Sequence, residues 1–216
     1  MDIYLVDLIK RMNETSDQVL KPGFRSEETI SWKALREAEK LNKPEFITQL
    51  VEFINDEKNK KNRDRAYFAL GHLAKNIKSY YATQYLIQRI EKETDKYIIS
   101  ALLDRIAELD KPNGTDLKPI IKETTNKKWL VRYSAIRALK YSNDKLAEET
   151  LIEILDHSND SGDLIYGSST LFRVGTMKAI PHLERLLNSR KRDVKLSAQV
   201  AIEEIHKRHI NNLEKD

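Results

Sequence analysis

The sequence predicts an all-α protein, a solenoid of about five stacked helix pairs behind an N-terminal helical cap. Two observations carry this prediction. The composition is rich in helix formers, with 40% hydrophobic and 33% charged residues but only 6 glycines and 5 prolines among 216 residues. A helix–turn–helix pattern also recurs with a period near 33 residues, and periods of this length are typical of helical repeat arrays.

The N-terminal segment 1–43 does not follow the repeat and is expected to form the cap. Its residues 2–13 predict an amphipathic helix, and 14–25, which contain a Pro-Gly pair, predict a loop. Ser26 is an expected N-cap because two glutamates follow it in the first turn, so a second helix is predicted from there to about Leu41. Such a cap would cover the apolar edge of the first repeat.

The following residues, 44–208, predict five helix pairs. Their expected bounds are about 44–77, 78–113, 114–143, 144–176 and 177–208. In each pair the first helix has apolar residues at three- and four-residue steps, and a short polar turn precedes the second helix. The second helices align with one another; 129–140, for example, superposes on 162–173 at an offset of 33 residues. The polar residues 209–216 predict a fraying tail, and the chain is expected to be one structural domain.

The fifth repeat has a specific motif, and the third repeats it. A proline stands early in the first helix, and the second helix follows the pattern V-[RK]-x-x-A-x-x-A-[LI]. The residues in this pattern are Pro181, Val194, Lys195, Ala198, Ala201 and Ile202, and Pro119, Val131, Arg132, Ala135, Ala138 and Leu139. This motif resembles the short, bacterial-type HEAT repeat, also found in PBS-lyase-type proteins. The resemblance covers 44–208 and implies a right-handed α-α superhelix, an armadillo-like fold that serves as a protein-binding scaffold.

Composition excludes several classes of function. The chain has no cysteine, so disulfides, thiol catalysis and cysteine-ligated zinc are excluded, and a cytoplasmic location is expected. No run of about 18 apolar residues predicts a membrane span, and Asp2 and Asp7 disfavour a secretory signal. The net charge of +4 permits nucleic-acid binding without requiring it.

No catalytic or metal-binding constellation is evident in the sequence. The stretch Gly167-Ser168-Ser169 lacks the second glycine of a nucleophile elbow, because Leu171 stands there, and a packing role is expected instead. The histidines do not form a zinc-binding helix motif. We therefore expect no enzymatic activity, no cofactor and no metal.

Two enzyme families are built of similar repeats. HEAT-like alkylpurine DNA glycosylases imply a tryptophan four residues before a catalytic aspartate, but Trp129 is followed by Tyr133 at that spacing. Phycobilin lyases share similar repeats as well, and nothing in this sequence supplies their chemistry.

The predicted function is binding of a protein or peptide in a concave groove lined by the second helices. Tyrosine and arginine, which are favoured at interfaces, are expected on this surface. The candidate groove residues are Tyr67, Leu103, Arg132, Tyr133, Ile136, Tyr166, Ser169, Lys195, Leu196 and Gln199. Arg132 has an alternative structural role, because this position in HEAT repeats commonly bonds to the preceding turn, here near Asn126.

The second prediction is binding of nucleic acid or another polyanion along the edge formed by the inter-helix turns. Cations at helix N-termini favour anions because the helix dipole adds to their charge. The candidate residues of this basic turn edge are Lys58, Lys60, Lys61, Lys127, Lys128, Arg190, Lys191 and Arg192. Acidic residues in the fourth repeat interrupt the row, so protein binding is preferred.

Overall fold

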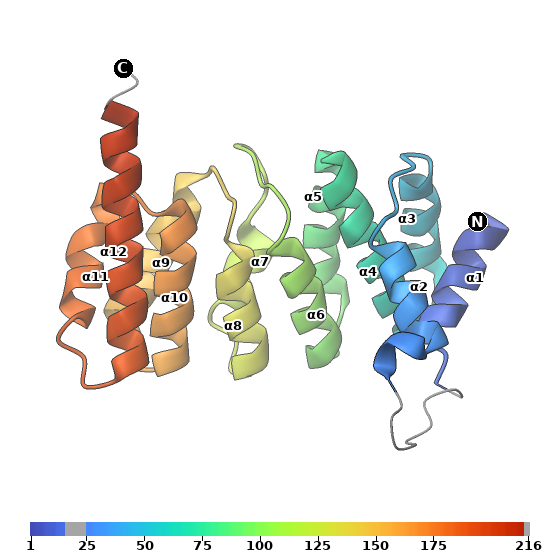
Figure 1. Ribbon diagram of the computed structural model, residues 1–216, viewed down its shortest axis with the longest axis horizontal. Coiled ribbons are helices and arrows are strands. Elements are labelled where there is room, and N and C mark those ends of the chain that lie inside the picture. The colour runs from blue at the N-terminus through green and yellow to red at the C-terminus, as the bar shows by residue number, and fades with distance from the viewer. Residues whose placement is uncertain (16–24, 214–216) are drawn as a thin grey trace. The chain divides into compact units, whose positions relative to one another are not determined.

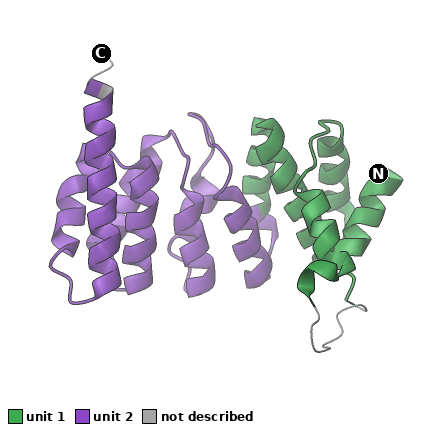
Figure 2. Ribbon diagram, viewed as in Figure 1, with its two compact units in different colours: residues 1–89 green, residues 90–216 purple. Residues whose placement is uncertain are grey.

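The computed structural model describes residues 1–15 and 25–213, which form twelve α-helices and three short 3₁₀ turns, with no β-strand among them (Figure 1). The all-α prediction is confirmed. The chain divides into two compact units, Met1–Arg89 and Ile90–Asp216 (Figure 2). This boundary falls inside the second predicted repeat, and the repeat bounds and the single-domain organisation stay predictions. Most of the expected loop at 14–25 lies outside the described residues.

In unit 1 the N-terminal helices α1 (Ile3–Met12) and α2 (Ile30–Ala38) pack against each other and against α4 (Lys60–Ile77). The prediction that Ser26 caps the second helix is wrong. The cap is Thr29, whose hydroxyl accepts a hydrogen bond from the Trp32 backbone N–H at 3.1 Å. The same hydroxyl donates to the Ser26 carbonyl at 2.8 Å, so Ser26 starts a separate 3₁₀ turn, Ser26–Glu28.

The rest of unit 1 consists of α3 (Phe46–Asp56) and α5 (Tyr80–Arg89), and both of these helices pack on α4. Phe46, Leu50 and Ile54 recur at four-residue steps on α3 and are buried, as expected for an amphipathic helix. Helix α4 ends at Lys78, whose left-handed backbone (φ 52°) terminates the helix directly before α5.

Unit 2 contains α6 followed by three helix pairs. Its α-helices are α6 (Lys96–Ile106), α7 (Lys118–Glu123), α8 (Trp129–Ala138), α9 (Lys145–His157), α10 (Ser161–Val174), α11 (Ile180–Leu186) and α12 (Arg192–Leu213), and its 3₁₀ turns are Ile90–Lys92 and Met177–Ala179. The second helices α6, α8, α10 and α12 pack side by side in one layer, and each of α7, α9 and α11 packs on the second helix that follows it (Figure 1).

Small residues allow the close approach of neighbouring helices in unit 2. The hydroxyls of Ser100 on α6 and Ser134 on α8 are hydrogen-bonded at 2.9 Å in the buried interface between these helices. A Cβ at Gly167 would lie 3.1 Å from Leu155 Cδ2 of α9. The predicted packing role is confirmed for Gly167 and Ser168, which are buried, and is wrong for Ser169, which is exposed.

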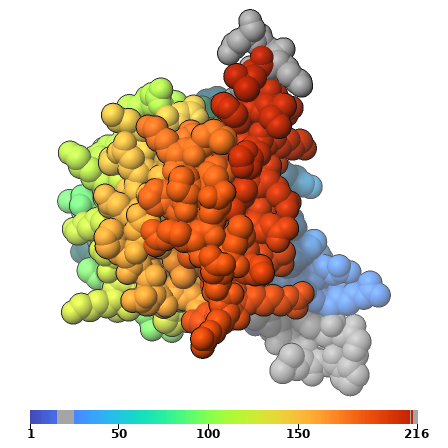
Figure 3. Space-filling model, turned by 90° about the vertical axis from the view of Figure 1, so that its left-hand side faces the viewer, coloured from blue at the N-terminus to red at the C-terminus, as the bar shows by residue number. Residues whose placement is uncertain are grey.

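Helix α12 continues to Leu213, into the stretch that was expected to fray. Arg208 explains part of this order, because its guanidinium donates hydrogen bonds to the carbonyls of Phe172 and Gly175 at the end of α10. Figure 3 views the end of unit 2 formed by α9 to α12, with the last turns of α12 projecting beyond the neighbouring helices. The polar tail therefore begins later than the composition suggests.

Candidate functional site

The second-helix layer in unit 2 carries several exposed apolar side chains. Trp129 on α8 is 60% exposed, and Leu196 and Val200 on α12 are 50% and 43% exposed. Tyr133, Tyr166, Ser169 and Phe172 complete this surface, which we call the second-helix face. Tyr166, Ser169 and Arg173 follow one another at three- and four-residue steps, so they form one stripe along α10.

Three aromatic rings form a ladder across α8 and α10. The ring centroids of Trp129 and Tyr133 are 5.5 Å apart, and those of Tyr133 and Tyr166 are 5.1 Å apart. Both pairs are tilted, by 50° and 38°, and these separations are in the range at which aromatic pairs attract each other. The ladder joins the exposed surfaces of two consecutive repeats.

Tyr133 is held in place by the N-terminus of α10. Its hydroxyl donates to Asp160 Oδ1 at 2.7 Å, and the same oxygen accepts the Gly162 backbone N–H at 2.8 Å, which caps the helix. The hydrogen bond from Tyr133 holds the pKa of Asp160 below its usual value, and burial raises the pKa of Tyr133 to about 12. Tyr133 therefore serves both the structure of the repeat and the exposed face.

Arg132 has a structural role and does not line the groove. Its guanidinium donates to Asp163 Oδ1 at 2.7 Å, to Asp160 Oδ2 at 3.0 Å and to the Asn126 carbonyl at 2.9 Å. The side chain is only 16% exposed. Assignment of Arg132 to the groove is thus wrong, and the alternative of a bond to the preceding turn is confirmed and extended to the acids of the next turn.

Next to the ladder lies an apolar groove of about 530 Å³ between α10 and α12. Phe172, Leu196 and Val200 provide its apolar surface. Its other lining residues are Lys140, Ser169, Arg173, Asp193 and Ser197. The Arg173 guanidinium lies 5.0 Å from the Phe172 ring centroid, a cation–π contact that keeps its charge at the rim of the groove.

The structure brings four of the predicted groove residues onto the second-helix face: Tyr133, Tyr166, Ser169 and Leu196. Three others, Tyr67, Leu103 and Ile136, are at most 1% exposed, so their assignment to the groove is wrong.

The physical reason is the helix register. Ile136 and Leu103 face into the packed layer, and the Tyr67 hydroxyl accepts a hydrogen bond from Arg89 Nε at 3.0 Å within unit 1. Lys195 and Gln199 are exposed on α12 but do not line the apolar groove; Gln199 donates to Glu203 at 3.0 Å.

Sequence reasoning missed Trp129, Phe172, Arg173 and Val200. The signal was present: on α8 the outward stripe starts at Trp129 and continues through Tyr133 at a four-residue step. The predicted outward positions at 132 and 136 lie one residue before the exposed stripe, because Arg132 and Ile136 are turned inward.

The eight residues of the basic turn edge are all exposed. Lys58, Lys60 and Lys61 belong to unit 1. In unit 2, Lys127, Lys128, Arg190 and Lys191 lie in the turns before α8 and α12, and Arg192 is the first residue of α12. Lys191 donates to the Ser161 hydroxyl. The turn before α10, which follows the turn before α8 and precedes the turn before α12 in the chain, carries Asp160. Arg132 forms an ion pair with this aspartate. Anion binding along this edge stays a prediction.

Across residues 1–15 and 25–213, no group of three or more histidine, aspartate or glutamate side chains lies in an arrangement that could hold a metal ion. No helix in the same part of the chain is both long and apolar enough to cross a membrane.

Comparison with known proteins identifies the fold. No protein-family model and no curated protein sequence matches the chain. Among solved structures, a designed armadillo repeat protein aligns with a TM-score of 0.53 and 17% identity, covering 93% of this chain and 99% of that one. An engineered protein aligns with a TM-score of 0.50 and 17% identity, covering 96% and 98%. The chain is thus similar to armadillo-like repeat solenoids, and at this identity the likeness concerns the fold alone.

Proposed function

We propose that this protein is a non-catalytic interaction module that binds a protein segment or peptide on the second-helix face of unit 2. The observation that carries the proposal is the apolar groove of Phe172, Leu196 and Val200 beside the ladder of Trp129, Tyr133 and Tyr166. Contiguous exposed apolar surface of this kind marks binding sites, and aromatic residues are enriched in interface hot spots. Helical repeat arrays commonly use one extended face for binding.

The motif in the third and fifth repeats supports assignment of the array to the HEAT type within the armadillo-like folds. A cytoplasmic location is part of the same proposal, and the absence of cysteine from all 216 residues is compatible with it.

The groove suggests what the bound segment contains. Its volume of about 530 Å³ accommodates a few apolar side chains of a peptide. Lys140 and Arg173 lie at its rim with Asp193 as the single acid. We therefore expect the segment to present apolar anchors with an acidic residue next to them, because charge complementarity across an interface sets register and specificity.

The test compares two charge-introducing variants on the same helix. Leu196→Glu places a carboxylate in the groove, whereas Ile210→Glu changes a residue that is also apolar and exposed, at 55%, but distant in sequence from the groove residues. Both variants and the parent protein are used to capture binding proteins from the native cell lysate, with quantification by mass spectrometry. We expect a specific set of proteins to be lost with Leu196→Glu and retained with Ile210→Glu.

Partners from that set are then purified, and we expect their Kd for the parent protein to be at least tenfold lower than their Kd for the Leu196→Glu variant. Circular dichroism and thermal unfolding of both variants confirm that each is folded. If the captured proteins are the same for all three proteins, or if both variants lose them equally, the second-helix face is not the binding site.

A further inference from the structure

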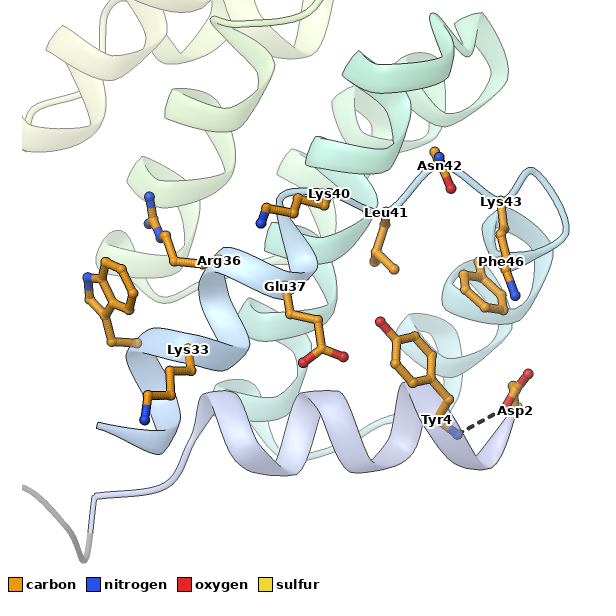
Figure 4. A pocket seen from close by; sticks show the side chains of 11 residues that line it. Asp2, Tyr4, Lys33, Arg36, Glu37, Lys40, Leu41, Asn42, Lys43 and Phe46 are labelled. Atoms are coloured by element: carbon orange, nitrogen blue, oxygen red, sulfur yellow. Dashed lines mark hydrogen bonds between the residues drawn. The ribbon is translucent and has the colours of Figure 1, made fainter. Parts of the chain in front are cut away.

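Unit 1 contains a second pocket that the proposed function does not use. Its volume is about 540 Å³, and it lies between the start of α1, the outer side of α2 and the segment that leads into α3 (Figure 4). All its lining residues belong to the N-terminal part of unit 1, so it is independent of the second-helix face. The sequence assigned this region only the role of a cap.

One side of this pocket is apolar and aromatic. The rings of Tyr4 and Phe46 are stacked, with centroids 5.9 Å apart and an interplanar angle of 26°. Figure 4 shows Tyr4, Leu41 and Phe46 directed toward a common space. Phe46 and Leu41 are buried, whereas Tyr4 is 37% exposed and so offers ring surface to a ligand. A flat apolar group could therefore pack on this wall.

The charges around the pocket favour an anion. Four cations, Lys33, Arg36, Lys40 and Lys43, line it together with two acids. Both acids are already engaged. Asp2 accepts the Tyr4 backbone N–H at 2.9 Å and caps α1, and Glu37 forms two hydrogen bonds with Arg11, at 2.8 and 3.1 Å.

The bond from Arg11 holds the pKa of Glu37 below its usual value, so this carboxylate is ionised and already compensated at neutral pH. Because Arg11 already neutralises the Glu37 carboxylate, Glu37 does not need an ion pair with a lysine of the pocket.

The lysines of the pocket are less engaged than the acids. Arg36 pairs with Glu39 at 2.5 Å. Within the part of the chain that the structure describes, Lys33, Lys40 and Lys43 form no ion pair; Lys43 lies over the Phe46 ring at 5.4 Å. Lys43 thus stands beside the apolar wall with a charge that no carboxylate neutralises, whereas the Lys40 side chain lines the pocket on the side of Arg36 (Figure 4). The positive charges of Lys33, Lys40 and Lys43 around one pocket repel one another, and a bound anion would reduce this repulsion.

We propose that this pocket binds a small organic anion made of a flat apolar body and one carboxylate or phosphate group. The body packs on Tyr4, Leu41 and Phe46, and the acid group lies next to Lys43, away from Glu37, with Lys40 adding to the positive charge of the pocket. The volume is within the range of pockets that hold small ligands, about 300–1,000 Å³, and the combination of an apolar wall with a few polar groups is typical of such sites. A carboxylate and a phosphate on the ligand each present oxygen acceptors to which lysine ammonium groups donate hydrogen bonds.

The experiment uses the full chain labelled with ¹⁵N and follows it by two-dimensional NMR. The chain has two tryptophans, so Trp129→Phe leaves a single indole N–H signal, that of Trp32 in the pocket. Two anions are titrated, AMP for the phosphate and 3-phenylpropionate for the carboxylate. Each is compared with its neutral counterpart, adenosine or 3-phenylpropionamide.

We expect at least one anion to shift the signals of Trp32 and of the Lys43 and Phe46 backbones, with a Kd at least tenfold below that of its neutral counterpart. Which anion binds identifies the acid group. The variant Lys40→Glu plus Lys43→Glu should weaken binding at least tenfold. The matched control, Lys195→Glu plus Lys207→Glu, changes two exposed lysines of α12 by the same charge and should bind as the parent does.

The NMR spectrum itself shows whether each variant is folded. Three outcomes overturn the proposal: neither anion shifts the pocket signals at millimolar concentration, the neutral counterparts bind as tightly as the anions, or both double variants bind equally. None of them affects the proposal for the second-helix face, which is tested in the other unit.

Discussion

At the scale of single residues, Gly162 sets the position of Tyr133. A Cβ at residue 162 would lie 2.3 Å from Tyr133 Cζ and 2.4 Å from its hydroxyl oxygen. These distances are far below van der Waals contact, so any larger residue must move the ring. The ring in turn holds the hydrogen bond to Asp160 and the middle position of the aromatic ladder.

The Gly162→Ala variant should therefore be destabilised, although Ala usually stabilises a helix relative to Gly by up to about 1 kcal/mol. Loss of the Tyr133–Asp160 hydrogen bond, which has a charged acceptor, costs about 1.5–3 kcal/mol, so a net loss of about 1 kcal/mol is expected. Urea unfolding measures it. In a Tyr133→Leu background the clash with the hydroxyl is absent, and the same change should be neutral or stabilising; equal effects in both backgrounds would show that the ring is not the cause.

Lys111 is a second residue whose environment the sequence does not reveal. It is fully buried, and its ammonium group donates to the carbonyls of Ile106 and Leu109 at 2.9 and 2.6 Å, at the end of α6. Its own backbone bridges to the loop after α8, donating to the Tyr141 carbonyl at 2.8 Å. Burial lowers the pKa of Lys111 to about 7, despite the nearby Asp110 and Glu108.

This shift predicts a pH dependence of stability. Folded Lys111 releases its proton near pH 7, whereas a lysine in the unfolded chain releases it near pH 10, so between these values the unfolded state binds more protons. The free energy of unfolding should consequently rise as the pH increases from 7 to 9. Urea unfolding at pH 7, 8 and 9 measures the slope, which Lys111→Met should reduce. Parallel pH profiles for the two proteins would contradict the assignment to Lys111.

At the scale of elements, one guanidinium connects consecutive second helices of unit 2. Arg132, at the start of α8, bonds to Asp160 and Asp163 at the start of α10 and to the turn before its own helix. Ser158 donates to the second oxygen of Asp163 at 2.8 Å, so this carboxylate is bonded on both sides. In unit 1 Arg63 makes a related contact, donating to the carbonyls of Glu57 and Lys58 at 3.1 and 2.9 Å.

The variant Arg132→Lys tests the strength of this connection. A lysine has one ammonium group and cannot reproduce the fork that contacts both carboxylates and the carbonyl. Since the side chain is largely buried, we expect a loss of about 2–3 kcal/mol in the free energy of unfolding. Arg137→Lys on the same helix is the control, because its side chain is 37% exposed and makes one bond to Asp104, worth at most about 1 kcal/mol. Equal losses for the two variants would argue against a special role of Arg132.

At the scale of the whole molecule, the balance of charge separates the two predicted functions. The chain carries 38 basic and 34 acidic residues, and at the turn before α10 in unit 2 the charge of Arg132 is paired with Asp160 and Asp163. A nucleic-acid groove needs many unpaired cations because its affinity comes from neutralising phosphates, and the salt dependence of binding increases with the number of phosphates neutralised. The second-helix face is largely apolar and is not such a groove.

Binding to duplex DNA should accordingly be weak and only moderately dependent on salt. We expect the slope of log Kobs against log [salt] to be no steeper than about −3, corresponding to about three phosphate contacts. Fluorescence anisotropy with a labelled duplex between 50 and 200 mM salt measures it. A slope of about −6 or steeper that is lost on replacing Lys127, Lys128 and Arg190–Arg192 by glutamate would assign the function to the basic turn edge instead.

Much of the candidate site followed from repeat alignment, but its register did not. Tyr133, Tyr166 and Leu196, which occupy aligned positions in successive repeats, lie on the second-helix face, and so does Ser169, which aligns with Ile136. Ile136 was placed outward although it packs inside the layer. A helix between two neighbours buries a wider arc than an isolated amphipathic helix, and a pattern of three- and four-residue steps does not show where that arc ends.

The sequence by itself determined that this chain is all-helical and that the small residues Gly167 and Ser168 allow its helices to pack, because periodicity, turn residues and helix propensity are local properties. Only the tertiary structure decided which stripe of each second helix faces outward, that Arg132 belongs to a buried network, that Lys111 is enclosed, and that α1, α2 and the segment before α3 form a pocket. These depend on side chains distant in sequence, whose burial and charge exist only after the helices have packed.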